Sequence, residues 1–124
     1  MKRRPLAGID LRNFQKEGDL VHFDYRDEFG QLREGMMILW DGVLRAYENR
    51  CPHWKTPLNT HGDGVLDEGE GMLICHTHGA LFRPEDGYCI SGPCEGEGLI
   101  RLEVQEKETR AWVYRPGLEL GLSR

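Results

Sequence analysis

Two short cysteine–histidine pairs constrain this chain more than any other feature of its sequence. Cys51 and His53 are separated by one residue, and after 21 further residues Cys75 and His78 are separated by two. Thiolate sulfur and imidazole nitrogen are ligands for transition metals. Spacings of one and two residues let both members of a pair reach one metal region from a tight loop. We therefore expect the chain to fold so that two loops meet at a metal site formed by these four side chains.

The donors alone do not identify the metal group. A structural zinc ion also accepts two cysteines and two histidines. Zinc fingers, however, keep the cysteines together and the histidines together, whereas here each loop supplies one of each. A [2Fe–2S] cluster with two cysteines on one iron and two histidines on the other suits this mixed arrangement, because each loop can then reach both irons. The pattern favours the cluster and leaves zinc as the alternative.

The segments that flank the ligand pairs are predicted to be β-strands. The predicted strands are residues 19–25, 35–40, 43–48, 99–105 and 110–115. An Asp-Gly dipeptide separates the second strand from the third, and this is a strong hairpin signal because a type I′ turn needs positive φ at both central residues. A polar turn separates the last two strands, and no stretch of a dozen residues has a helical period. The sequence therefore predicts an antiparallel β frame with an insert at residues 51–98.

The insert differs from its flanks in composition. Residues 51–98 hold nine of the 16 glycines, all four cysteines, and eight acidic residues against two basic ones. Such a segment is predicted to be rich in loops. The acidic side chains of the insert either form a plain solvated surface or attract a basic partner electrostatically.

Length and overall charge limit the class of protein. The 124 residues suit a single domain, residues 1–124, and the net charge of −5 argues against a nucleic-acid partner. No apolar run is long enough to span a bilayer, and no apolar segment follows the basic start, as a secretory signal requires. We therefore expect a cytoplasmic protein with no nucleic-acid or membrane partner.

The ligand pairs and their surroundings resemble those of the Rieske iron–sulfur family. The matching motifs are Cys-Pro-His-Trp at 51–54, Leu-Ile-Cys-His-Thr-His-Gly-Ala-Leu-Phe at 73–82, and Gly-Tyr-Cys-Ile-Ser-Gly-Pro at 87–93, which resembles the family's proline loop. The resemblance implies that Cys51 and Cys75 bind the buried iron of a [2Fe–2S] cluster. His53 and His78 would bind the outer iron. It also implies an all-β fold, a Rieske-like antiparallel β sandwich or barrel with an inserted cluster-binding subdomain at about 51–94.

The sequence departs from the Rieske members of respiratory and photosynthetic cytochrome complexes at two places. Thr56 and Thr77 stand where those members carry the two cysteines of a disulfide. Ala80 and Phe82 stand where they carry side chains that donate hydrogen bonds to the cluster. Because fewer donors leave the reduced, more negative cluster less stabilised, we predict a reduction potential toward the low end of the Rieske range.

Two further cysteines, Cys89 and Cys94, enclose a turn that contains Gly92 and Pro93. They are either free structural thiols or a local disulfide that braces the proline loop. A cytosolic location favours free thiols, because cytosolic thiols usually stay reduced. A metal-binding or redox role is the third alternative.

The resemblance implies an electron-transfer protein rather than an enzyme, and no nucleophile paired with a base stands out in the sequence. This Rieske-type ferredoxin would take one electron from a flavin-containing NAD(P)H reductase. It would pass the electron to a terminal oxygenase of the aromatic-ring-hydroxylating type. Two alternatives stay open, namely a zinc-stabilised protein-interaction module and a cluster-bearing sensor or accessory subunit.

Overall fold

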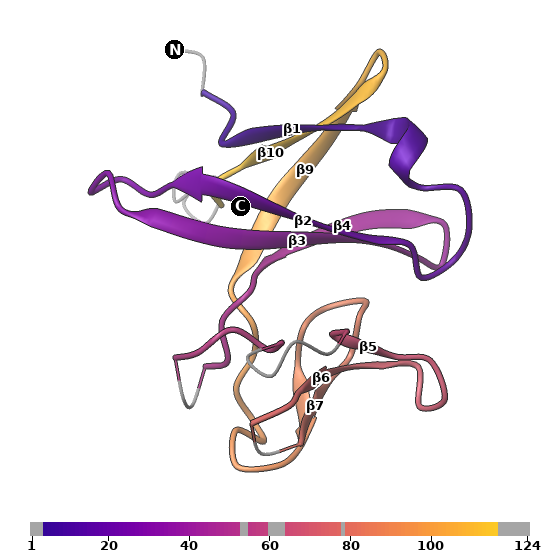
Figure 1. Cartoon of the computed structure of the whole chain (residues 1–124), viewed down its shortest axis with the longest axis vertical. Coiled ribbons are helices and arrows are strands. Elements are labelled where there is room, and N and C mark those ends of the chain that lie inside the picture. Colours follow the sequence, from indigo (N-terminus) through magenta and orange to yellow (C-terminus); the bar gives the residue numbers. More distant parts are fainter. Residues whose placement is uncertain (1–3, 53–54, 60–63, 78, 117–124) are drawn as a thin grey trace, which may run out of the picture.

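The β-forming segments of the chain assemble into two antiparallel sheets (Figure 1). The computed structural model describes residues 4–52, 55–59, 64–77 and 79–116. Within these ranges the helical structure is one turn of 3₁₀ helix, Leu11–Asn13. No helix in the same ranges is long and apolar enough to cross a membrane. The predicted all-β class is therefore confirmed.

The larger sheet contains six strands in the order β1-β10-β9-β4-β3-β2. The strands are β1 (Ala7–Asp10), β2 (Leu20–Arg26), β3 (Leu32–Trp40), β4 (Val43–Glu48), β9 (Arg101–Lys107) and β10 (Arg110–Tyr114). The two edge strands, β1 and β2, come into contact, so the sheet curls into a nearly closed barrel. The five strands predicted from the sequence all belong to this sheet, whereas β1 was not predicted.

Both predicted hairpins form at the expected turns. Asp41 and Gly42, between β3 and β4, have φ angles of 56° and 76°, which fit the predicted type I′ turn. The register places Trp40 opposite Val43 directly before and after that turn. The β9–β10 hairpin turns at Glu108, whose φ is 61°.

The smaller sheet is inserted between β4 and β9, where the sequence predicted an insert. Its strands, in spatial order, are β5 (Leu66–Asp67), β6 (Met72–Cys75), β7 (Ala80–Phe82) and β8 (Cys89–Ser91). Figure 1 shows the labelled strands of this sheet as a separate layer beside the larger sheet. The four strands are short, and loops make up much of the inserted segment.

The core lies on both faces of the larger sheet, and β3 contributes to each side. Met36 and Ile38 belong to a buried cluster shared with the smaller sheet, whereas Met37 belongs to a second cluster inside the barrel. Successive side chains of a strand point to opposite faces, so a strand that is covered on both faces reads as a continuous apolar run. The smaller sheet thus packs on the outer face of β3 and β4, and the first cluster includes all four cysteines.

Candidate metal centre

The first ligand loop begins where β4 ends, and a buried asparagine holds it in place. The backbone N–H of Asn49 donates to the carbonyl of Glu34 at 2.8 Å, and its side-chain Oδ1 accepts from the N–H of Leu58 at 2.9 Å. Within the loop the N–H of Cys51 donates to the carbonyl of Thr56 at 2.7 Å, and the N–H of Lys55 donates back to the carbonyl of Cys51 at 2.7 Å. Cys51 is therefore hydrogen-bonded to the described residues that follow it in the loop, and the loop is fixed near the start of β3 and the end of β4.

The second ligand loop connects β6 to β7. Cys75 and Ala80 face each other in the register, and the N–H of Gly79 donates to the carbonyl of Cys75 at 2.8 Å. Gly79 has a φ of 74°, which favours glycine because it has no Cβ. The ring of His76 lies with Nε2 at 2.7 Å from the carbonyl oxygen of Gly64. The His76 ring is thus engaged with the segment before β5.

The two ligand loops contact each other directly through Leu58. Its N–H donates to Asn49, and its carbonyl accepts from the N–H of His76 at 2.9 Å. The Leu58 side chain is completely buried in the shared cluster. The structure therefore brings together the two loops that carry the predicted ligand pairs, although Cys51 follows a strand of the larger sheet and Cys75 ends a strand of the smaller one.

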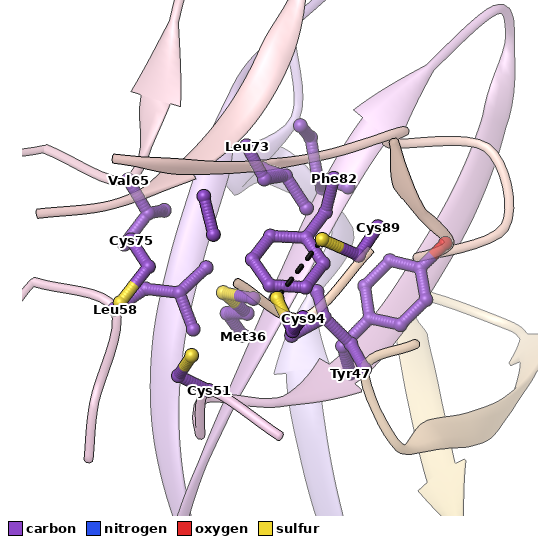
Figure 2. Packing of buried hydrophobic residues seen from close by; sticks show 13 residues of the cluster. Met36, Tyr47, Cys51, Leu58, Val65, Leu73, Cys75, Phe82, Cys89 and Cys94 are labelled. Carbon is purple, nitrogen blue, oxygen red and sulfur yellow. Dashed lines mark hydrogen bonds between the residues drawn. The ribbon is translucent and has the colours of Figure 1, made fainter. Parts of the chain in front are cut away.

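The two cysteines of the predicted ligand set lie side by side inside the protein. Cys51 is 1% exposed and Cys75 is 0% exposed (Figure 2). Burial is the main cause that raises the pKa of Cys75, and Cys51 adds to it by hydrogen bonding and by charge. The backbone N–H and the hydroxyl of Thr77 act in the opposite direction. Two thiols within one buried apolar cluster suit a soft metal, whose binding releases their protons.

The two predicted histidine ligands, His53 and His78, lie outside the described residues. Within the described ranges no third cysteine, histidine or carboxylate completes a group of metal ligands. The assignment of the four ligands therefore stays a prediction, of which the structure describes the cysteine half.

The segment after β8 packs against the second ligand loop. A Cβ added at Gly92 would lie 2.8 Å from Cα of Ala80, so the backbone of this segment touches the first residue of β7 directly. Ala80 and Phe82 are buried at 2% and 0% exposure, and neither side chain carries a donor. The motif that resembles a proline loop is therefore placed beside the ligand loops.

Cys89 and Cys94 are free thiols in the structure, and both are buried. Their sulfur atoms lie 2.9 Å apart, and the thiol of Cys89 also donates to the carbonyl of Ser91 at 3.3 Å. Burial is the main cause that raises the pKa of Cys94, followed by the hydrogen bonding and charge of Cys89 and then of Cys51. Cys94 and Cys51 therefore belong to the same buried cluster.

A comparison with protein families decides the class of this domain. The model of the Rieske [2Fe-2S] domain matches residues 12–109, which is most of the chain. This chain belongs to the Rieske [2Fe-2S] domain family. Membership implies a [2Fe–2S] cluster, so the predicted cofactor is confirmed at the level of the family.

Solved structures show the same fold. The ferredoxin of carbazole 1,9a-dioxygenase from Nocardioides aromaticivorans IC177 is 22% identical, with a TM-score of 0.66 over 92% of this chain and 98% of that one. A ferredoxin from Sphingomonas yanoikuyae B1 is 20% identical, with a TM-score of 0.65 over 93% of this chain and 100% of that one. A complex of reduced oxygenase and oxidized ferredoxin in carbazole 1,9a-dioxygenase also contains a similar chain, 24% identical, with a TM-score of 0.64 over 86% of this chain and 88% of that one. A search of the curated proteins finds no match.

The described residues of this Rieske domain fit a [2Fe–2S] cluster. Two buried thiols from two loops are the donor set that one iron of such a cluster needs. Sequence reasoning found these cysteines through their spacing. It missed Asn49, because that residue acts through hydrogen bonds to Glu34, Leu58 and Asn59, which only the folded chain brings together.

Proposed function

We propose that this Rieske domain is a ferredoxin, a one-electron carrier rather than an enzyme. In this proposal Cys51 and Cys75 hold one iron of the cluster, and His53 and His78 hold the other. The observation that carries the proposal is the pair of buried, adjacent thiols on two loops that are hydrogen-bonded through Leu58. Such a site supplies a redox centre, and no separate substrate pocket is needed for one-electron transfer.

The chain's own residues have two tasks in this function. The buried cluster of Met36, Leu58, Leu73 and Phe82 excludes water from the cysteine side of the centre. Asn49 and the backbone of Leu58 hold the two loops at a fixed separation. When bound, the [2Fe–2S] group accepts and releases one electron. A rigid site favours electron transfer because it changes little between the two charge states.

The proposed partners are a flavin-containing NAD(P)H reductase and a terminal oxygenase, in the cytoplasm. The oxygenase is supported by the structurally similar ferredoxin in the carbazole 1,9a-dioxygenase complex. The reductase rests on the resemblance to the Rieske ferredoxins alone. Five acidic residues of the insert are exposed, and they favour a partner with a basic docking surface. They are Glu68, Glu70, Glu85, Glu95 and Glu97.

Mediated electron transfer tests the carrier function. Purified protein is added to NADPH, a ferredoxin–NADP⁺ reductase and oxidised cytochrome c, and cytochrome reduction is followed by absorbance. The rate should rise in proportion to the added wild-type protein and should not rise with the Cys75→Ala variant. Wild-type protein that holds its cluster but mediates no reduction would favour the sensor or accessory subunit instead. A colourless protein with stoichiometric zinc, which cannot be reconstituted with iron and sulfide, would favour the interaction module.

A further inference from the structure

A carboxylate near the start of β3 is hydrogen-bonded to the buried asparagine that precedes the first ligand pair. Oε2 of Glu34 accepts from Nδ2 of Asn49 at 3.1 Å, and the backbone carbonyl of Glu34 accepts from the N–H of Asn49 at 2.8 Å. Asn49 is 3% exposed, whereas the Glu34 side chain is 36% exposed. A partly exposed carboxylate of the larger sheet thus reaches the interior of the protein through Asn49.

The hydrogen bonds of Asn49 continue to both ligand loops. Its Oδ1 accepts from the N–H of Leu58 at 2.9 Å, and the carbonyl of Leu58 accepts from the N–H of His76 at 2.9 Å. Leu58 follows the first ligand pair in the chain, and His76 lies inside the second pair. A continuous series of hydrogen bonds therefore joins Glu34 to the loops that carry both predicted ligand pairs.

The neighbours of Asn49 leave its side-chain amide one orientation. An ionised carboxylate can only accept, and a backbone N–H can only donate, so the amide nitrogen must face Glu34 and the amide oxygen must face Leu58. Asn59, whose Oδ1 accepts from Nδ2 of Asn49 at 3.0 Å, adapts to either orientation because its own amide holds a donor and an acceptor. If the Asn49 amide turned over, the buried N–H of Leu58 would lose its acceptor, which costs more than the net contribution of an ordinary hydrogen bond.

We propose that Glu34 is a positioning residue for the cluster: its carboxylate orients the Asn49 amide and so fixes how the two ligand loops meet. The inference rests on the proposed function, in which those loops carry the iron ligands. Groups that orient metal ligands through hydrogen bonds change metal affinity although they do not touch the metal. The same oxygen of Glu34 lies 3.0 Å from Nδ1 of His22, so the edge strand β2 holds the carboxylate from its other side.

Exchanging donor and acceptor between the two side chains tests the inference. Asn49→Asp sets two acceptors against each other, and Glu34→Gln supplies a donor for the new carboxylate. The double variant Glu34→Gln/Asn49→Asp therefore restores the hydrogen bond with its direction reversed, and it keeps the net charge of the wild type. Asn49→Asp alone should release iron to a chelator roughly tenfold faster than the wild type, because a bond to a charged acceptor is lost. The double variant should return close to the wild-type rate, and no recovery in a folded double variant would overturn the inference.

Amide hydrogen exchange of the segment that contains Leu58, followed by mass spectrometry on the cluster-loaded protein, is a second readout that does not depend on the folding of Asn49→Asp. Glu34→Leu removes the acceptor and should speed this exchange roughly tenfold, whereas Glu34→Gln can still accept and should not. Asp24→Asn is the matched control for charge, because Asp24 is exposed and lies opposite Glu34 in the β2–β3 register. His22→Ala controls for the second contact of the carboxylate, and neither control should change the exchange.

The outcomes separate the inference from the proposed function on which it rests. Equal exchange in Glu34→Leu and the wild type, with clusters in both, contradicts the inference and leaves the proposed function intact. Faster exchange in Asp24→Asn by the same factor would assign the effect to charge alone and would also contradict the inference. A wild-type protein that holds no cluster overturns both.

Discussion

Burial is common to the cysteines at this centre, so their position on the two ligand loops separates the proposed ligands from the other cysteines. Cys51, Cys75 and Cys89 are all almost fully buried, yet only the first two lie on the hydrogen-bonded pair of loops. We predict that Cys51→Ala and Cys75→Ala each lose most of the bound iron and sulfide, because each removes a proposed ligand. Cys89→Ala should keep both. Iron and acid-labile sulfide assays check this, and iron retained at wild-type levels in Cys75→Ala would refute the ligand assignment.

The close contact between Gly92 and Ala80 gives a prediction on stability. Gly92 has a φ of 108°, and an added Cβ would lie 2.8 Å from Cα of Ala80. Gly92→Ala should therefore lower the free energy of unfolding by about 2 kcal/mol through backbone strain and overpacking. Gly96→Ala is the matched control, because Gly96 has a φ of 94° but open space around its Cα. Urea denaturation followed by circular dichroism should show the larger loss for Gly92→Ala, and equal losses would rule out the contact as the cause.

Sequence reasoning at this scale works for residues whose role is local. The Asp-Gly turn is read within two residues, and the prediction of a turn at Asp41 is confirmed. The cysteine–histidine spacing is equally local, and the ligand roles of Cys51 and Cys75 stay a prediction. Asn49 could not be found in this way, since its acceptor and donor partners lie 15 and 9 positions away. The burial of Cys94 and Cys51 in one cluster likewise depends on how the two sheets pack.

Strands could likewise be predicted where they pair with a neighbour in the sequence, but not where they pair with a distant segment. The hairpin strands were predicted because each pairs with its sequence neighbour across a short turn. By contrast, β1 has four residues and pairs with β10 at the other end of the chain, with Ala7 opposite Val113. A segment of four residues is too short to show the alternation of apolar and polar residues that predicts a strand. The apolar run in β3 was visible, but its burial on both faces became clear only from the position of the smaller sheet.

Tyr47 joins β4 to the inserted segment. Its hydroxyl donates to the carbonyl of Pro84 at 2.6 Å, and burial raises the pKa of Tyr47 to about 12. Tyr47→Phe should lower the free energy of unfolding by about 1–2 kcal/mol, because the buried carbonyl loses its donor. Tyr88→Phe, at a tyrosine that is 43% exposed, should change it by less than about 0.5 kcal/mol. Equal effects of the two substitutions in urea denaturation would argue against this link between the sheets.

The turn between β7 and β8 predicts a dependence of stability on pH. The hydrogen bond from the Arg83 guanidinium lowers the pKa of Asp86 below its usual value, and the N–H of Tyr88 adds to this effect. Burial raises the pKa, but by less than Arg83 lowers it. A carboxyl whose pKa is lower in the folded state stabilises the fold above its unfolded pKa, and this contribution is lost as pH falls through the folded pKa. Asp86→Asn should therefore be less stable than wild type at pH 7, and the difference should shrink below about pH 4. Thermal unfolding across this range checks the trend, with Glu85→Gln as the control. A difference that does not change with pH would exclude the ion pair as its source.

The whole molecule places its candidate centre where two sheets meet. Cys51 follows a strand of the larger sheet, whereas Cys75 ends a strand of the smaller one. The position of the insert could be predicted, because composition changes sharply at residues 51–98. The packing of the insert on β3 and β4 could not be predicted from the sequence. It depends on which face of the apolar run in β3 the rest of the larger sheet leaves uncovered. That the chain forms a single domain stays a prediction.

The most direct test of the account is an electron paramagnetic resonance spectrum of anaerobically purified, dithionite-reduced protein, with iron and acid-labile sulfide assayed on the same sample. The account predicts a rhombic signal with the low average g value of histidine-ligated iron, and about two irons and two sulfides per chain. A signal typical of a cluster held by four cysteines would contradict the ligand assignment. A silent, colourless sample with stoichiometric zinc, which fails to take up iron and sulfide on reconstitution, would contradict the electron-carrier account as a whole.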